Sequence, residues 1–329
     1  MNRNYSVITG FMGKLKDRFI DYQPPRDMEE MVEMASRIKG CKALEVVYPQ
    51  NFTDPVKTRE LLNRYGLEVS TVNLNVKGEE IWRFGSFSSS DPKARRAAIE
   101  ALKASMDAAA AFGCNMVTTA MLGDGSDYPF ELDYSRAFKQ AAESITEAAE
   151  YRPDVKISLE YKMSEPRVHC LFNNAGKMAA FCGAVGRDNV GITLDVGHAL
   201  QCGEIPADSA AFLDAVGRLF YIHVNDNYRN WDWDLLPGTV NLWDYVEFLV
   251  YLNRTGYDGW ITADVFPGRH DPVETMTKTF EWMDFLGELA DRFDQNDLFQ
   301  RMDRNKSFEM LDYMRDTIFS AGGKSHDRY

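Results

Sequence analysis

Eight short apolar runs recur along the chain, and longer helical patterns separate them. The runs are YSVITG at 5–10, ALEVVYP at 43–49, EVSTVNLNV at 68–76, CNMVTTAM at 114–121, KISLEYK at 156–162, VGITLDVGHA at 190–199, LFYIHVND at 219–226 and GWITADV at 259–265. Strands of a parallel sheet are buried on both faces, so they read as continuous apolar runs. Eight strand–helix units in about 290 residues predict an α/β protein of the closed (β/α)8 type.

The clearest helical pattern begins after Asp91 and ends before Gly113, residues that suit a helix cap and a helix exit. Similar patterns cover 134–152, 241–256 and 271–293. An open doubly wound sheet is the competing arrangement, but no run leads into a GxGxxG turn. We assign 1–293 to a (β/α)8 TIM barrel catalytic domain and 294–329 to a C-terminal helical extension. That extension could fold back on its own barrel or clasp a neighbouring chain.

The composition excludes several classes of partner. The 329 residues carry 50 acidic and 37 basic side chains, a net charge of −13, whereas nucleic acids and anionic membranes require a basic face. No run reaches the roughly 20 apolar residues of a membrane helix, and the N-terminal segment lacks a signal-peptide pattern. The five cysteines form no CxxC pair and fit free thiols in a reducing compartment. We therefore expect a cytoplasmic protein.

Ionisable side chains gather at the ends of the last four runs. They are Glu160 and Lys162, Asp195 and His198, His223, and Asp264, together with Asp232 and Asp234 in the loop after the seventh run. Active sites of such barrels lie at the carboxyl ends of the strands. Each residue alone could be a helix cap, a loop anchor or a satisfied core histidine. Because ionised carboxylates are costly to bury without a partner, their succession favours a site for Mn²⁺, Mg²⁺ or Co²⁺.

The spacing of these residues suggests two sets of ligands. Asp195 and His198 are three residues apart where the chain leaves a strand, so both can face one ion. Asp232 and Asp234 are two apart, so in an extended loop they point the same way. The inner set, around the barrel axis, is Glu160, Asp195, His223 and Asp264. The outer set is His198, Asp232 and Asp234, with Asp195 available to bridge.

Several motifs resemble a known group of enzymes. EYKMSEPR at 160–167 resembles the Glu-x-Lys-x-x-Glu-Pro-Arg segment of xylose isomerase and bacterial L-rhamnose isomerase. LDVGHA, the His223 run, the DWD pair and Asp264 follow in the same order, and SFSSSDPKARRAAIE at 86–100 is also similar. Over most of the barrel the chain thus resembles the xylose isomerase-like TIM barrel superfamily of sugar isomerases and epimerases.

The resemblance implies a metal-dependent aldose–ketose isomerase, an intramolecular oxidoreductase of carbohydrate metabolism. A hydride would move between C1 and C2 of an open-chain sugar, assisted by two divalent metals per chain, with Mn²⁺ favoured over Co²⁺ or Mg²⁺. The inner set would hold the structural metal and the outer set the catalytic one. The implied catalytic residues are Glu160, Lys162, Asp232 and Asp264. The resemblance also implies a homodimer or homotetramer.

Other residues are candidates for contact with the sugar. Lys162 would hydrogen-bond the carbonyl end of the substrate. Trp82 and Phe84 could wall off the sugar or simply pack, and Arg167 could face a polar or anionic end. Glu45 and Asn73 lie near strand ends and could hydrogen-bond hydroxyl groups.

The sequence departs from those isomerases in one respect. They use a histidine in the first half of the barrel to open the sugar ring, whereas the first histidine here is His169. The main alternative is a single-metal ketose 3-epimerase, or a related sugar lyase or dehydratase, with Glu160 and Asp264 as acid and base. An apurinic endonuclease would need more histidines and a basic face. A barrel that works only as one subunit of a two-protein lyase is a further possibility.

Overall fold

Eight parallel strands close into a barrel in the computed structural model, which describes residues 3–50, 54–165 and 168–319. Their order around the barrel is β1-β13-β12-β11-β8-β6-β5-β4. The bounds are β1 (Asn4–Ile8), β4 (Cys41–Tyr48), β5 (Glu68–Leu74), β6 (Met116–Ala120), β8 (Lys156–Glu160), β11 (Val190–Asp195), β12 (Leu219–Val224) and β13 (Trp260–Ala263). Each strand overlaps one of the eight apolar runs, so the predicted (β/α)8 TIM barrel is confirmed.

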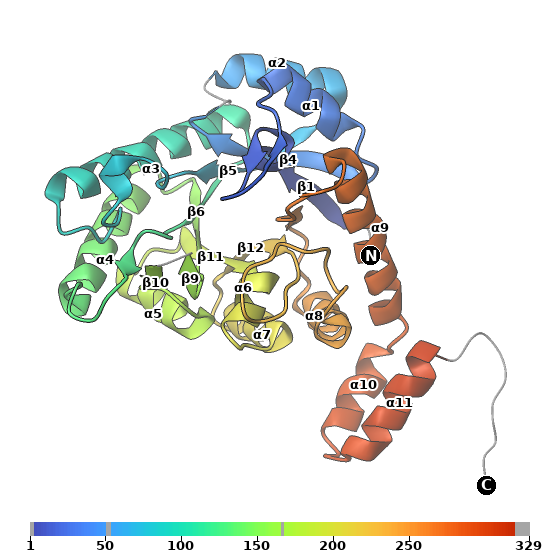
Figure 1. Cartoon of the computed structure of the whole chain (residues 1–329). Helices are drawn as coiled ribbons and strands as arrows, with labels where there is room; N and C mark the ends of the chain where they lie inside the picture. The colour runs from blue at the N-terminus through green and yellow to red at the C-terminus, as the bar shows by residue number, and fades with distance from the viewer. Residues whose placement is uncertain (1–2, 51–53, 166–167, 320–329) are drawn as a thin grey trace, which may run out of the picture.

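Helices surround the barrel (Figure 1). They are α1 (Met28–Ser36), α2 (Pro55–Tyr65), α3 (Pro92–Phe112), α4 (Tyr134–Tyr151), α5 (Ala175–Val185), α6 (Val196–Gln201), α7 (Pro206–Ala215), α8 (Leu242–Thr255) and α9 (Pro272–Asp291). The start of α3 follows the prediction, because the Asp91 side chain accepts a hydrogen bond from the Lys93 amide. Gly113 ends the helix at a φ of 87°, where a side chain would be strained.

Short elements add to the loops that follow β1, β5, β6 and β8. They are the 3-10 helices η1 (Thr9–Met12) and η2 (Glu80–Trp82), the hairpin β2 (Leu15–Lys16) and β3 (Asp21–Gln23), and a small sheet of β7 (Gly125–Ser126), β9 (Ser164–Glu165) and β10 (Val168–Cys170). None of them could be predicted from the sequence, because segments of two to four residues show no measurable periodicity. All of them follow carboxyl ends of barrel strands, the face that carries active sites in this fold.

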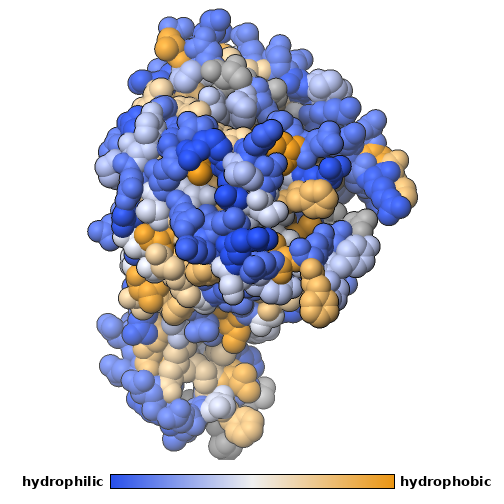
Figure 2. Space-filling view, turned by 90° about the vertical axis from the view of Figure 1, so that its left-hand side faces the viewer, coloured by the Kyte–Doolittle hydropathy of each residue, from blue (hydrophilic) through white to orange (hydrophobic). Residues whose placement is uncertain are grey.

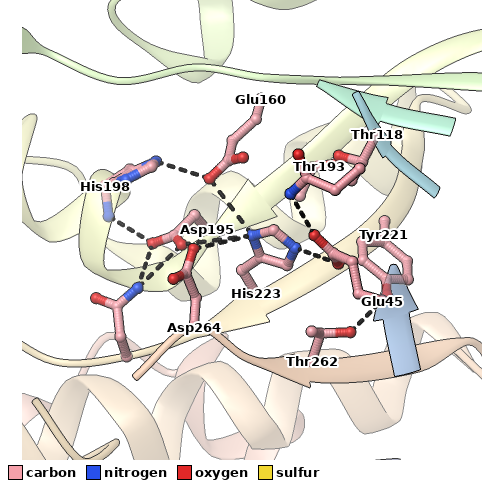
Figure 3. A network of polar contacts seen from close by, with 12 residues as sticks. Glu45, Thr118, Glu160, Thr193, Asp195, His198, Tyr221, His223, Thr262 and Asp264 are labelled. Carbon is pink, nitrogen blue, oxygen red and sulfur yellow. Dashed lines mark hydrogen bonds and ion pairs between the residues drawn. The ribbon is translucent and has the colours of Figure 1, made fainter. Parts of the chain in front are cut away.

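Hydroxyl groups fill part of the barrel interior. Tyr221 donates to Ser70 Oγ over 2.9 Å, and the Thr193 hydroxyl lies 2.8 Å from that of Thr118 and 2.7 Å from that of Ser158. All of these side chains are buried. Because buried polar groups are stable when they are hydrogen-bonded, this network lets the interior carry polar residues next to the ionisable side chains shown in Figure 3.

The C-terminal helices α10 (Gln295–Met302) and α11 (Ser307–Phe319) project from the barrel beside α8 (Figure 1). The ring centroids of Phe299 and Tyr251 are 5.5 Å apart, and the Arg254 guanidinium lies 3.7 Å from the centroid of the Phe299 ring. In Figure 2 this part forms a narrower lobe below a mostly hydrophilic face. The helices thus contact α8 of their own chain, and the domain boundary at 293 stays a prediction. Within the described residues, no helix combines the length and apolar character needed to cross a bilayer.

Candidate metal centre

Four consecutive barrel strands bring the inner ligand set together. Glu160 ends β8, Asp195 ends β11, His223 lies in β12, and Asp264 follows β13. The parallel register places Asp195 opposite His223. One ligand atom from each of the four residues lies within 4.8 Å of all the others, as the close-up in Figure 3 illustrates.

The two nitrogens of His223 have different surroundings. Nε2 lies 2.9 Å from Glu45 Oε2, whereas Nδ1 faces three carboxylates, 3.4 Å from Glu160, 3.4 Å from Asp264 and 3.8 Å from Asp195. Among the described residues, neither His223 Nδ1 nor Glu160 Oε1 has a well-formed hydrogen bond, although both are buried. A buried nitrogen lone pair that faces three carboxylates suits a divalent cation. The inner set therefore fits a metal ion.

The ionisation of the side chains in the centre also favours a bound metal ion. Burial, together with the carboxylates of Asp264 and Glu160, raises the pKa of Asp195 to about 7. Burial and the neighbouring Asp232 and Asp264 also raise the pKa of Asp234. Burial opposes the charged form of His223, but the adjacent Glu45 and Glu160 outweigh it and raise its pKa. Without a cation the centre therefore has to take up protons, and a divalent ion would replace them.

The outer ligand set lies beside the inner set, where His198 Nδ1 is 3.1 Å from Glu160 Oε1. His198 Nε2 is 3.2 Å from Asp232 Oδ2, and that oxygen is also 2.8 Å from Lys162 Nζ. Lys162 makes a second ion pair with Glu165. Asp232 Oδ1 is buried without a hydrogen-bond partner in the described part of the chain, and Asp234 has a φ of 47°. The mutual 4.8 Å spacing holds only for the inner set among the described residues, so the second metal stays a prediction.

A tight strand-to-helix junction positions Asp195. Its side chain accepts a hydrogen bond of 2.8 Å from the His198 amide and so caps α6. The strand ends at Asp195, as predicted, and the helix begins at Val196. Asn225 Nδ2 donates to both Asp195 oxygens, over 3.0 and 2.9 Å. Gly197 makes room for this contact, because a Cβ there would lie 1.7 Å from Asn225 Oδ1.

Two residues beside the centre have roles that the sequence analysis did not predict. Glu45 is fully buried against His223 rather than facing the cavity, and Asn73 Nδ2 donates to its other oxygen over 2.6 Å. A glutamate inside the apolar run ALEVVYP was a usable signal, because a buried carboxylate requires a partner. Asn225 offered no comparable signal, since an asparagine after a strand is common in ordinary loops.

A cavity of about 660 Å³ lies above the centre, and the segments that follow all eight barrel strands contribute to its wall. Its volume falls in the usual range of small-molecule sites, about 300–1,000 Å³. Glu160, Lys162, His198, Asp232 and Asp264 are among its lining residues, together with Asp234.

The predicted aromatic contacts lie elsewhere. Trp82 packs in the hydrophobic core, and Phe84 is 67% exposed with the Arg83 guanidinium over its ring. Neither is among the described residues that line the cavity. Arg167 lies outside the described residues. The roles predicted for all three in sugar binding stay predictions.

Comparison with known proteins agrees with this architecture. The family model described as "Xylose isomerase-like TIM barrel" matches residues 32–286. The chain is 24% identical over 278 residues to a "Probable sugar isomerase" of Mesorhizobium japonicum, covering 79% of this chain and 63% of that protein. It is 26% identical over 207 residues to the xylose isomerase of Thermus thermophilus, covering 61% of this chain and 54% of that enzyme. These alignments span less than two thirds of either relative.

A solved structure shares the fold at lower identity. The structure of an L-ribulose 3-epimerase superposes with a TM-score of 0.71 and 16% identity, covering 88% of this chain and 96% of that one. Because the family model covers most of the barrel and the fold agrees with it, the chain belongs to the xylose isomerase-like TIM barrel family.

Proposed function

We propose that the protein is a metal-dependent sugar isomerase that interconverts an aldose and a ketose. One observation carries the proposal: the outer set with Lys162 shares a cavity with the inner set. A single-metal enzyme has no need for the buried contacts among His198, Asp232 and Lys162. Two relatives named as sugar isomerases support the same class of reaction.

The two ligand sets would hold divalent ions, with Mn²⁺ favoured because the ligands mix carboxylate oxygens and imidazole nitrogens. The inner set comprises Glu160, Asp195, His223 and Asp264, and the outer set comprises His198, Asp232 and Asp234, with Asp195 shared. A bound divalent ion supplies the Lewis acidity that polarises a carbonyl oxygen.

The remaining steps fall to the side chains. In the aldose-to-ketose direction the C2–H bond breaks, its electron pair forms the new C1–H bond, and the O2 proton moves to O1. Lys162 would donate a hydrogen bond to O1 while negative charge develops there. Burial opposes ionisation of Asp232, but His198 and Lys162 outweigh it and keep the pKa of that carboxyl below its usual range. Ionised Asp232 would therefore orient a water molecule that carries the proton from O2 to O1.

The test is metal-restored sugar conversion. The protein is stripped with a chelator, reloaded with Mn²⁺, Co²⁺ or Mg²⁺, and offered a panel of aldoses and ketoses. We expect about two ions per chain and conversion that Asp232→Asn abolishes. The exposed Asp214 in α7 provides a matched control as Asp214→Asn. Conversion that persists at full rate in Asp232→Asn would contradict the proposal.

Ketose 3-epimerisation is the second candidate. The single compact ligand group among the described residues favours it, because one ion would then suffice. The two reactions differ in what happens to hydrogen. An epimerase exchanges a carbon-bound proton with solvent, so a ketose incubated in D₂O would gain deuterium at C3. The hydride shift proposed here would leave C3 unlabelled.

A further inference from the structure

The wall of the cavity has two sides of opposite charge. The metal centre occupies the segments that follow β8, β11, β12 and β13. The segments after β1 and β5 contribute Lys14, Lys16 and Lys77. In the barrel order, β5, β4 and β1 are consecutive and lie across from β12, β11 and β8. The three lysines therefore face the acidic centre across the mouth of the barrel.

The carboxylates near these lysines do not pair with them in the described residues, not even Asp21, which lies opposite Lys16 in the β2–β3 hairpin. None forms an ion pair within 4.0 Å in the part of the chain that the structure describes, and all three are exposed. Asp17, next to Lys16, accepts hydrogen bonds from the amides of Phe19 and Ile20 instead. Glu80, near Lys77, pairs with Arg83 over 3.6 Å. Asp21 and Glu79 are the other acidic residues close to the lysines in the sequence, and neither makes an ion pair in the described residues.

The positive region continues into an adjoining cavity of about 360 Å³, whose wall includes Lys14, Gln50 and Arg26. The Arg26 guanidinium donates to the Met12 carbonyl and to Gln23 Oε1, both uncharged acceptors. Several basic residues on the outer helices are paired, among them Lys103 with Glu147 and Lys278 with Glu281. In a chain with 50 acidic and 37 basic residues, four cations without a carboxylate partner at one mouth are an imbalance.

We propose that the substrate is an anionic sugar whose phosphate or carboxylate lies at the end remote from the metal centre, against Lys14, Lys16 and Lys77. The inference rests on the proposed function, since it assumes a sugar in this cavity. Lysine ammonium groups bind phosphate and carboxylate as point charges. The lysines attract an anionic end, so the field of the cavity would orient the sugar with that end against them.

The test uses open-chain probes that carry no aldehyde or keto group and are therefore not converted. Calorimetry compares xylitol, xylitol 5-phosphate and xylonate on the metal-loaded protein. We expect at least one of the two anions to bind about tenfold or more tightly than xylitol, with an advantage that declines as NaCl is added. The anion that shows the advantage identifies the source, phosphate or carboxylate.

The lysines are tested by the triple substitution Lys14→Gln, Lys16→Gln and Lys77→Gln. It should remove the preference for the anion while xylitol binding stays unchanged. The control is a triple substitution of exposed lysines outside the cavity, Lys93→Gln, Lys139→Gln and Lys306→Gln, which should keep the preference. This comparison also distinguishes an anion bound at the lysines from one bound at the metal. An anion bound directly to the metal would still bind more tightly than xylitol in the first triple variant.

Two results would overturn the inference: equal affinity for all three probes, or an anion preference that survives the first triple substitution. Failure of this inference is distinguishable from failure of the proposed function. Conversion of neutral aldoses without any anion preference would support the isomerase and contradict the proposal of an anionic substrate. An anion preference that depends on the lysines, without aldose–ketose conversion, would support the anionic ligand and contradict the isomerase.

Discussion

His223 Nε2 lies 2.9 Å from Glu45 Oε2, and both side chains are fully buried. The contact joins β12 to β4 across the barrel interior, since these strands are not neighbours in the sheet. Asn73 holds the second oxygen of Glu45. A carboxylate in this position fixes the tautomer of a histidine ligand and the orientation of its ring. Glu45 thus determines that His223 presents Nδ1 to the three carboxylates.

Glu45→Gln should therefore weaken metal binding by about 10- to 100-fold, the usual loss when the partner of a histidine ligand is changed. Titration of the metal-free protein with Mn²⁺ in a calorimeter measures the effect. Glu68→Gln, at the exposed start of β5, is the matched control and should bind Mn²⁺ like the unmodified protein. Unchanged affinity in Glu45→Gln would show that the contact does not orient the ligand.

Gly197→Ala should also weaken metal binding. The added methyl group would lie 1.7 Å from Asn225 Oδ1, so Asn225 has to move away from Asp195, whose two oxygens it now holds. Gly183 in α5 is the matched control, because a Cβ there meets nothing within 4 Å. Gly183→Ala should leave the affinity unchanged and stabilise the helix by up to about 1 kcal/mol. Equal Mn²⁺ affinity of the two variants would contradict the role assigned to Gly197.

Metal removal should lower the melting temperature. An ion that binds only the folded chain stabilises it by about 2.7 kcal/mol at a hundredfold excess over its Kd. Differential scanning calorimetry with and without Mn²⁺ measures this gain. Asp195→Asn should lose most of it while keeping α6, because asparagine also caps helices well. A full Mn²⁺-induced rise in that variant would argue against Asp195 as a ligand.

Asp124 should contribute strongly to stability although it lies outside the metal centre. Its buried carboxylate accepts hydrogen bonds from the amides of Ser86 and Ser88, over 3.0 and 2.7 Å, and from both hydroxyls. Asp124→Ala leaves these donors without their acceptor and should reduce the free energy of unfolding by at least about 2 kcal/mol. Urea unfolding measures it, and Asp214→Asn should change it by less than about 0.5 kcal/mol. A comparable, small effect of both substitutions would refute this role.

The cysteine thiols should react slowly in the folded protein and destabilise it at high pH. Burial raises the pKa of every thiol from 9.0, to about 11 for Cys114 and to about 12 for Cys41, Cys170, Cys182 and Cys202. Between pH 9 and 11 the folded chain then binds more protons than the unfolded chain. The free energy of unfolding should therefore fall with rising pH, by at most about 1.4 kcal/mol per thiol and pH unit.

Labelling with a thiol reagent at pH 8, before and after addition of urea, tests the first part. Cys182→Ala tests the second, because it removes one titrating group and should make the decline of stability above pH 9 shallower. Rapid labelling of Cys170 and Cys182 in the folded protein would contradict their burial.

The barrel could be predicted from the sequence because its signal is repeated. Each strand is a continuous apolar run, and caps such as Asp91 and exits such as Gly113 mark the helices between them. The apolar run at 190–199 extends beyond its strand, because Val196 and Ala199 in the helix that follows are also buried. The hairpin β2–β3 was missed because its strands are too short to show a period.

The inner ligand set was predictable for a different reason. Glu160, Asp195, His223 and Asp264 are each an ionisable residue at the end of an apolar run, and the barrel brings such ends together. Contacts across the barrel were not predictable, because the sequences of two distant strands do not determine which of their residues face each other. The pairing of Glu45 with His223 depends on that register.

The inner ligand set takes its side chains from four barrel strands, or the residue after one, that are neighbours around the barrel: β8, β11, β12 and β13. A cation held there would act as a cross-link between these strands and would leave β1, β4, β5 and β6 without one. The two halves of the barrel would then differ in cooperativity. Amides of the second half would exchange with solvent more slowly once metal is bound, while those of the first half would keep the protection of their own packing.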